Sequence, residues 1–91
     1  MIDVQPYRIS IVGVGYVGLC TAVGFAYKGY KVIASTKNPK KAEMINQGKA
    51  PLHEPMLDDF LKKAVGENFL KCVPGRREAV LNTDITFITV G

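Results

Sequence analysis

The sequence predicts an α/β fold in which helices cover a doubly wound parallel sheet of about four strands. Short β-branched runs alternate with segments of helical spacing along all 91 residues, which is the pattern of parallel strands joined by helices. The last of these runs is nearly continuously apolar, as a strand buried on both faces requires. Right-handed crossovers then favour the strand order 3-2-1-4. The length allows one domain, residues 1–91.

The first predicted strand covers residues 9–12, because Ile9, Ile11 and Val12 form a short β-branched run that Gly13 interrupts. Helical spacing follows over residues 16–28. Val17, Cys20, Phe25 and their neighbours fall there at three- and four-residue steps.

The second strand is predicted at residues 31–35, and two helices follow it. Asn38 has the character of an N-cap and Pro39 of a first helical residue, so one helix begins there and ends near residue 48. The other helix covers residues 54–66. Its predicted apolar face consists of Leu57, Phe60, Leu61 and Ala64.

The third strand is predicted at residues 69–73 and a short helix at residues 76–81, after a Pro-Gly turn. Residues 85–90 are nearly all apolar or β-branched, as in a central parallel strand. The predicted order places this fourth strand beside the first, at the switch point where ligands bind. Its other edge is then open, and self-association through that edge is possible.

The spacing G-x-G-x-x-G follows the first predicted strand directly. It comprises Gly13, Val14, Gly15, Tyr16, Val17 and Gly18. Between a strand and a helix, this motif binds a dinucleotide in Rossmann-type folds. The first glycine permits a tight turn, the second lets the backbone approach a pyrophosphate, and the third lets the helix pack closely on the strand. The helix N–H groups and dipole then favour the phosphates. The alternatives are a tight turn without a ligand, or a site for a single phosphate or mononucleotide.

The end of the second strand is where such a unit contacts the cofactor ribose, usually through an Asp or Glu about 20 residues after the glycines. Thr36 occupies that place here, Lys37 follows it, and residues 35–38 contain no acid. A hydroxyl followed by a lysine suits the 2′-phosphate of NADP. In the other interpretation, Thr36 bonds an ordinary ribose and Lys37 is solvated.

Composition and the remaining polar residues exclude several other functions. The net charge of +4 and the pI of about 9.2 suit an anionic partner, but no basic stripe with interleaved aromatics predicts nucleic-acid binding. We expect no secretory signal and no membrane span, and therefore a cytoplasmic location. Cys20 and Cys72 are expected to be buried, unpaired thiols. His53 lacks a partner for metal or acid–base chemistry, and Asp58-Asp59 suits a helix start.

Residues 9–19, I-S-I-V-G-V-G-Y-V-G-L, resemble the opening of the UDP-glucose/GDP-mannose dehydrogenase family, in which G-Y-V-G-L is more specific than the glycines alone. Three further stretches agree with the family's sequence. Residues 46–57 are similar to its N-x-G…P-I-x-E-P-x-L segment, residues 77–80 to its E-E-A-V helix, and residues 84–91 to its D-V-I-F-I-x-V-G strand. The resemblance covers nearly the whole chain and makes it the N-terminal part of a dinucleotide-binding domain.

The resemblance implies an NAD-dependent, two-step oxidation of the primary alcohol of UDP-glucose or a similar nucleotide sugar to a carboxylate. It also implies that the glycine motif holds the cofactor diphosphate, that Lys41 contacts the cofactor, and that Val90 and Gly91 lie beside its ribose. Thr36 departs from the family's acid, so NAD is expected as the cofactor with NADP as the alternative.

The family's threonine-proline run, catalytic residues and substrate domain have no counterpart in this sequence, and neither cysteine matches its nucleophile motif. No catalytic or metal-binding residue is therefore assigned. The chain is expected to be a truncated segment that is inactive by itself; the alternative is a stand-alone nucleotide-sensing module.

Overall fold

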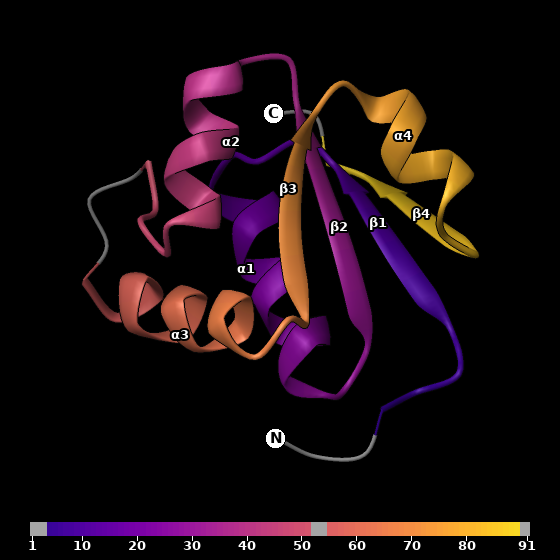
Figure 1. Cartoon of the computed structure of the whole chain (residues 1–91), viewed down its shortest axis with the longest axis horizontal. Coiled ribbons are helices and arrows are strands. Elements are labelled where there is room, and N and C mark those ends of the chain that lie inside the picture. Colours follow the sequence, from indigo (N-terminus) through magenta and orange to yellow (C-terminus); the bar gives the residue numbers. More distant parts are fainter. Residues whose placement is uncertain (1–3, 52–54, 90–91) are drawn as a thin grey trace.

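Strands and helices alternate along the chain as the sequence predicts (Figure 1). The computed structural model describes residues 4–51 and 55–89. Within them the elements are β1 (Arg8–Val12), α1 (Tyr16–Tyr27), β2 (Lys31–Thr36), α2 (Pro39–Asn46), α3 (Pro55–Gly66), β3 (Leu70–Pro74), α4 (Arg76–Leu81) and β4 (Ile85–Ile88). The four strands are parallel and lie in the order β3-β2-β1-β4, which confirms the predicted order.

Helices cover both faces of the sheet, which is the doubly wound arrangement. Figure 1 shows α1, α2 and α3 on one side of the strands and α4 on the other. The larger core lies under α1, α2 and α3, where the sheet contributes six side chains. These are Ile9, Ile11, Val32, Ala34, Leu70 and Cys72. Under α4 the core is much smaller and joins Ile33, Val73 and Ala79. The short α4 therefore leaves room on its own face of the sheet at both ends.

The buried faces of two helices differ from the prediction. The residues of α1 that pack on the sheet are Gly18, Leu19, Ala22, Val23 and Ala26. Cys20 is exposed, so its predicted burial is wrong, and Val17 of the glycine motif is 66% exposed. The physical reason is that α1 is apolar almost all round, and such a helix has no polar face from which its orientation can be deduced.

In α3, Leu57, Leu61 and Ala64 are buried as predicted, but Phe60 is 41% exposed. Its ring packs edge-on against Tyr27 of α1, with 5.1 Å between the ring centres. The ring thus covers the seam between two helices and lies outside the core.

Polar side chains fix the helix ends and the loop between α2 and α3. Asn38 is the N-cap of α2, as predicted: its Oδ1 accepts hydrogen bonds from the N–H groups of Lys40 and Lys41. Asp58 does more than meet the dipole of α3, because its carboxylate accepts a 2.7 Å hydrogen bond from the N–H of Ala50. This bond ties the loop to the first turn of the helix.

The two outer strands of the sheet, β3 and β4, differ in how far other parts of the chain cover them. Along β3, the Asn46 side chain accepts a hydrogen bond from the N–H of Cys72 at 2.7 Å and donates one to the Cys72 carbonyl at 2.8 Å. All four residues of β4 are exposed, including Ile88 at 70%. The regular part of β4 ends at Ile88; the sequence predicted a strand to residue 90, and the last part of that range lies outside the described residues.

Candidate functional site

The chain turns sharply where β1 ends, at the carboxyl edge of the sheet. Gly13 has a φ of +108°, a conformation that L side chains rarely adopt, and its N–H donates to the carbonyl of Ser35 at 3.0 Å. A Cβ at Gly13 would collide with the backbone oxygen of Thr89. The first glycine of the motif is thus required by the backbone and by the strand next to it.

Gly18 lies where α1 packs on this turn. A Cβ there would collide with the carbonyl of Gly13 and come within 2.6 Å of the Thr89 hydroxyl. Thr89 holds the turn from the other side: its N–H donates to the Val12 carbonyl at 2.9 Å and its hydroxyl to the Gly13 carbonyl at 3.1 Å. Sequence reasoning missed Thr89, although the predicted pairing of the first and fourth strands already placed its segment beside the turn.

Gly15 differs from these two glycines, because a Cβ at this position would have nothing within 4 Å. It is the N-cap of α1 and supplies no side-chain hydrogen bond to the helix. The N–H of Leu19 donates to its carbonyl at 2.9 Å, which is the first hydrogen bond of the helix, and the N–H groups of a helix's first turn point toward the loop that precedes it. Val14 is buried, while Tyr16 and Val17 lie exposed beside the opening. This open, amide-lined cradle fits a pyrophosphate, which binds such helix starts through N–H groups and the dipole.

A cavity of about 530 Å³ lies next to the turn. It is lined by Val12, Gly13, Ser35, Thr36, Lys37, Gly75, Arg76 and Arg77, and we call it the carboxyl-end pocket. The N–H of Gly75 donates to the carbonyl of Thr36 at 2.9 Å, so the start of α4 is joined to the end of β2. Two strand ends and one helix start therefore meet at this pocket.

The structure brings only some of the predicted site residues together. Thr36 and Lys37 line the carboxyl-end pocket, and the Thr36 hydroxyl accepts a hydrogen bond from the N–H of Asn38 at 3.2 Å. Lys41 lies in the first turn of α2 and is not part of the pocket lining. Val90, Gly91 and His53 lie outside the described residues.

Sequence reasoning missed Arg76 and Arg77, which line the same pocket from α4. The predicted order contained the signal, because β3 pairs with β2 and the residues that follow β3 must lie near the end of β2. The two arginines follow the Pro-Gly turn directly.

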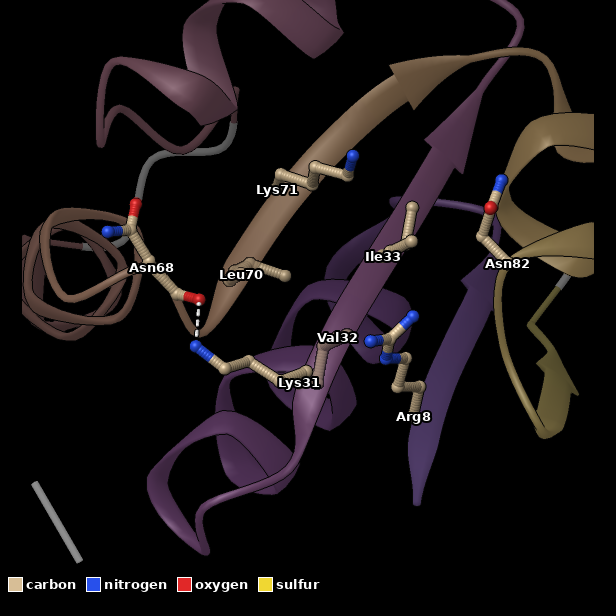
Figure 2. A pocket seen from close by; sticks show the side chains of 8 residues that line it. All are labelled: Arg8, Lys31, Val32, Ile33, Asn68, Leu70, Lys71 and Asn82. Atoms are coloured by element: carbon tan, nitrogen blue, oxygen red, sulfur yellow. Dashed lines mark hydrogen bonds between the residues drawn. The ribbon is translucent and has the colours of Figure 1, made fainter. Parts of the chain in front are cut away.

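A second cavity, of about 370 Å³, lies at the opposite end of the strands (Figure 2). It is lined by Arg8, Lys31, Val32, Ile33, Asn68, Leu70, Lys71 and Asn82, and we call it the amino-end pocket. In Figure 2 the Lys31 ammonium reaches the backbone oxygen of Asn68, to which it donates a hydrogen bond at 2.9 Å. Ligands of parallel α/β sheets bind at the carboxyl ends of the strands, so this pocket is on the wrong side for the cofactor.

The two cysteines give no sign of nucleophilic chemistry. Burial raises the pKa of the Cys72 thiol from 9.0 to about 11, so it stays protonated and unreactive at neutral pH. Cys20 is exposed on α1, away from the pocket lining. In the part of the chain that the structure describes, no group of three or more His, Cys, Asp or Glu residues is placed to hold a metal ion. None of the described helices has the length and apolarity needed to cross a bilayer.

A parallel sheet in the order 3-2-1-4, with a glycine turn between its first strand and first helix, defines the first half of a Rossmann-type dinucleotide-binding unit. The family comparison makes the assignment specific. Residues 7–91 match the NAD binding domain of the UDP-glucose/GDP-mannose dehydrogenase family, and the chain belongs to this family. The resemblance drawn from the sequence is thereby confirmed, and NAD is the cofactor of this domain.

Known relatives agree with this assignment. Over 84 residues the chain is 39% identical to GDP-mannose 6-dehydrogenase of Pseudomonas aeruginosa and 34% identical to UDP-glucose 6-dehydrogenase of Rhizobium meliloti. Each match covers 92% of this chain and 19% of the relative. The structure of a UDP-glucose dehydrogenase from Pyrobaculum islandicum matches with a TM-score of 0.89 at 37% identity, covering 94% of this chain and 20% of that one. The chain thus spans about a fifth of the length of these relatives.

Proposed function

We propose that the chain is the cofactor-binding segment of an NAD-dependent dehydrogenase that oxidises the primary alcohol of a nucleotide sugar, such as UDP-glucose or GDP-mannose, to a carboxylate. The observation that carries this proposal is the cradle at Gly15, where a side chain would meet only open space beside the first N–H groups of α1. The family relatives supply the substrate class, because their names specify a GDP- or UDP-sugar. We place the reaction in the cytoplasm.

The proposed site assigns separate tasks to its residues. Residues 13–18 hold the cofactor diphosphate through backbone N–H groups, and Thr36 and Lys37 lie at its adenosine ribose. Lys41, Val90 and Gly91 remain proposed contacts from the family resemblance. The bound NAD supplies a hydride acceptor. The chain's own part is to bind and orient this cofactor.

Catalysis is not assigned to any residue of this chain. We propose that a preparation of these 91 residues binds NAD⁺ but oxidises no nucleotide sugar, because the resemblance assigns the catalytic groups and the sugar-nucleotide site to a different part of the family's sequence. Mixing the chain with UDP-glucose or GDP-mannose and following NADH absorbance tests this point. Turnover by the chain alone would contradict it.

Titration with NAD⁺ by calorimetry tests the cofactor proposal, and Gly15→Val is the informative variant. Because the position faces open space, the valine leaves the fold intact and places two methyl groups where the diphosphate must approach. We expect the affinity for NAD⁺ to fall by about a hundredfold or more, as several N–H contacts are lost together.

Gly24→Ala is the matched control. Gly24 lies exposed in the middle of α1, and a Cβ there also meets nothing within 4 Å. This variant is expected to bind NAD⁺ like the parent chain. If a folded Gly15→Val chain bound NAD⁺ with unchanged affinity, the glycine turn would not be the cofactor site.

The exposed outer edge of β4 supports a further proposal, that copies of the chain pair through this strand. Ile85, Phe87 and Ile88 lie exposed on β4, and an unpaired strand edge is a template for another strand. Sedimentation analysis is expected to show a mass that rises with concentration. Ile88→Lys should shift the protein toward the monomer, because charged edge residues oppose strand pairing. A monomer at all concentrations would contradict the proposal.

A further inference from the structure

The carboxyl-end pocket is cationic and has no acid in its lining. Lys37 reaches it from the end of β2, and Arg76 and Arg77 reach it from α4. None of these three side chains makes an ion pair or a hydrogen bond with another described residue. Three cations without partners at one cavity create a positive field that is available to an external anion.

The wall of this pocket also contains an unused hydroxyl. Ser35 is 2% exposed, and its Oγ has no hydrogen-bond partner within the structure. Buried hydroxyls in proteins are nearly always paired. Ser35 pairs in register with Val12 and Val73, so its side chain lies on the α4 face of the sheet. The two arginines belong to α4, the helix that covers this face. A polar group without a partner thus accompanies the cations.

The position of the pocket identifies the part of the cofactor that reaches it. When a dinucleotide binds at the glycine turn, its adenosine ribose lies at the end of β2, where an acid would accept hydrogen bonds from the ribose hydroxyls. Thr36 at this place is neutral, so it does not repel a negative charge on the ribose. This step rests on the proposed cofactor site.

We propose that Lys37, Arg76 and Arg77 form a site for a phosphate group on the adenosine ribose, so that the chain accepts NADP⁺ as well as NAD⁺. A phosphate monoester carries a charge of about −1.5 to −2 at neutral pH. The planar guanidinium groups of arginine bind such a group through paired N–H donors, and the lysine adds a point charge. The arginines therefore determine cofactor specificity and leave the diphosphate to the glycine turn.

Calorimetric titration of the chain with NAD⁺, NADP⁺, 5′-AMP and 2′,5′-ADP tests the proposal without any turnover. We expect NADP⁺ to bind at least as tightly as NAD⁺, and 2′,5′-ADP about tenfold more tightly than 5′-AMP, since charge-assisted bonds to the added phosphate are strong. Inorganic phosphate is the third arm. It should compete with 2′,5′-ADP only weakly, because it lacks the ribose and base.

Substitutions separate the phosphate site from the rest. The double variant Arg76→Gln with Arg77→Gln is expected to lower the affinity for NADP⁺ by about tenfold or more and to leave the affinity for NAD⁺ within about twofold. Thr36→Asp should lower the affinity for NADP⁺ by a similar factor through charge repulsion. The matched control is Arg8→Gln with Lys71→Gln at the amino-end pocket, which removes the same charge and should change neither affinity.

The outcomes distinguish this inference from the proposed function. If NAD⁺ binds and NADP⁺ binds tenfold more weakly, or if the arginine variant loses no NADP⁺ affinity, the phosphate site is wrong and the NAD⁺ site stands. If neither dinucleotide binds the folded chain, both are wrong. If the control variant weakens NADP⁺ as much as the arginine variant does, the effect is general charge and the assignment to this pocket is overturned.

Discussion

The two pockets at the two ends of α4 have similar charge but differ in what that charge can do. The carboxyl-end pocket contains Lys37, Arg76 and Arg77, and the amino-end pocket contains Arg8, Lys31 and Lys71. At the amino end, Lys31 is already engaged. Its ammonium donates to the Asn68 carbonyl and lies 4.4 Å from the centre of the Phe69 ring. At the carboxyl end all three cations lack partners among the described residues.

Helix direction explains this difference. In a parallel α/β sheet each helix begins near the carboxyl end of a strand and finishes near the amino end of the next. The carboxyl end therefore collects helix starts with free N–H groups, which attract anions, and the amino end collects helix ends with free carbonyls, which attract cations. Lys31 bonds to a carbonyl just beyond the end of α3. Similar cationic groups are thus available to an anionic ligand at one end and contribute to internal stability at the other.

The largest expected effect on stability comes from a substitution at Gly18, at the carboxyl end of the sheet. We expect Gly18→Ala to lower the free energy of unfolding by about 2 kcal/mol, because the added methyl meets the backbone of Gly13 and the Thr89 hydroxyl, and backbone cannot move aside cheaply. Urea denaturation measures the change. Gly24→Ala is the control and should raise stability by up to about 1 kcal/mol, as expected for an exposed helical glycine. Equal stability of the Gly18 variant and the parent would show that the turn is looser than described.

A smaller effect is expected at the amino end. Lys31→Met keeps most of the length of the side chain but removes the charge, and with it the hydrogen bond to Asn68 and the cation–π contact with the Phe69 ring. The free energy of unfolding should fall by about 1 kcal/mol. The affinity for NAD⁺ should not change. Lys71→Met, at an exposed position of the same pocket, should alter stability by less than about 0.5 kcal/mol. Loss of NAD⁺ binding in Lys31→Met would end the distinction between the two pockets.

The last effect is absent at neutral pH, appears only at high pH, and comes from the middle of the sheet, between the two pockets. The folded-state pKa of Cys72 is about 11, above the ordinary thiol value of 9.0, so the unfolded chain loses this proton first. Thiol ionisation therefore lowers stability as the pH rises from about 9 to 11 and has no effect below that window. Denaturation curves give the free energy of unfolding at each pH. This free energy should depend on pH in the same way for the parent and for Cys72→Ala below pH 8, and should fall more steeply for the parent above pH 9. A parallel pH dependence throughout would contradict the raised pKa.

The sequence alone predicted most of the fold because its signals for helix starts and turns are strong. Asn38-Pro39 predicted the start of α2, and right-handed crossovers between the alternating strands and helices predicted the strand order. The orientation of α1 could not be predicted. With Val17, Cys20 and Phe25 among other apolar residues, no helical face stands out, and the sheet surface decides which residues are buried.

The candidate site was predicted in its local part and missed in its distant part. The glycine turn and Thr36 are encoded in consecutive residues with a recognised spacing, so pattern reasoning places them. Arg76 and Arg77 join the site only through the pairing of β3 with β2, about 40 residues away in the chain. Thr89 likewise reaches the turn only through the pairing of β4 with β1. Long-range pairing has no local signature.

The Asn46 side chain has a consequence for how large any assembly can become. Its amide occupies both backbone groups of Cys72 along the outer side of β3, and Pro74 on the same strand has no N–H to donate. A sheet that accepts strands on both flanks polymerises without limit, whereas one that accepts them on a single flank is saturated after one addition. The proposed pairing through β4 would therefore stop at two copies, because Asn46 and Pro74 oppose the addition of a strand at the β3 flank.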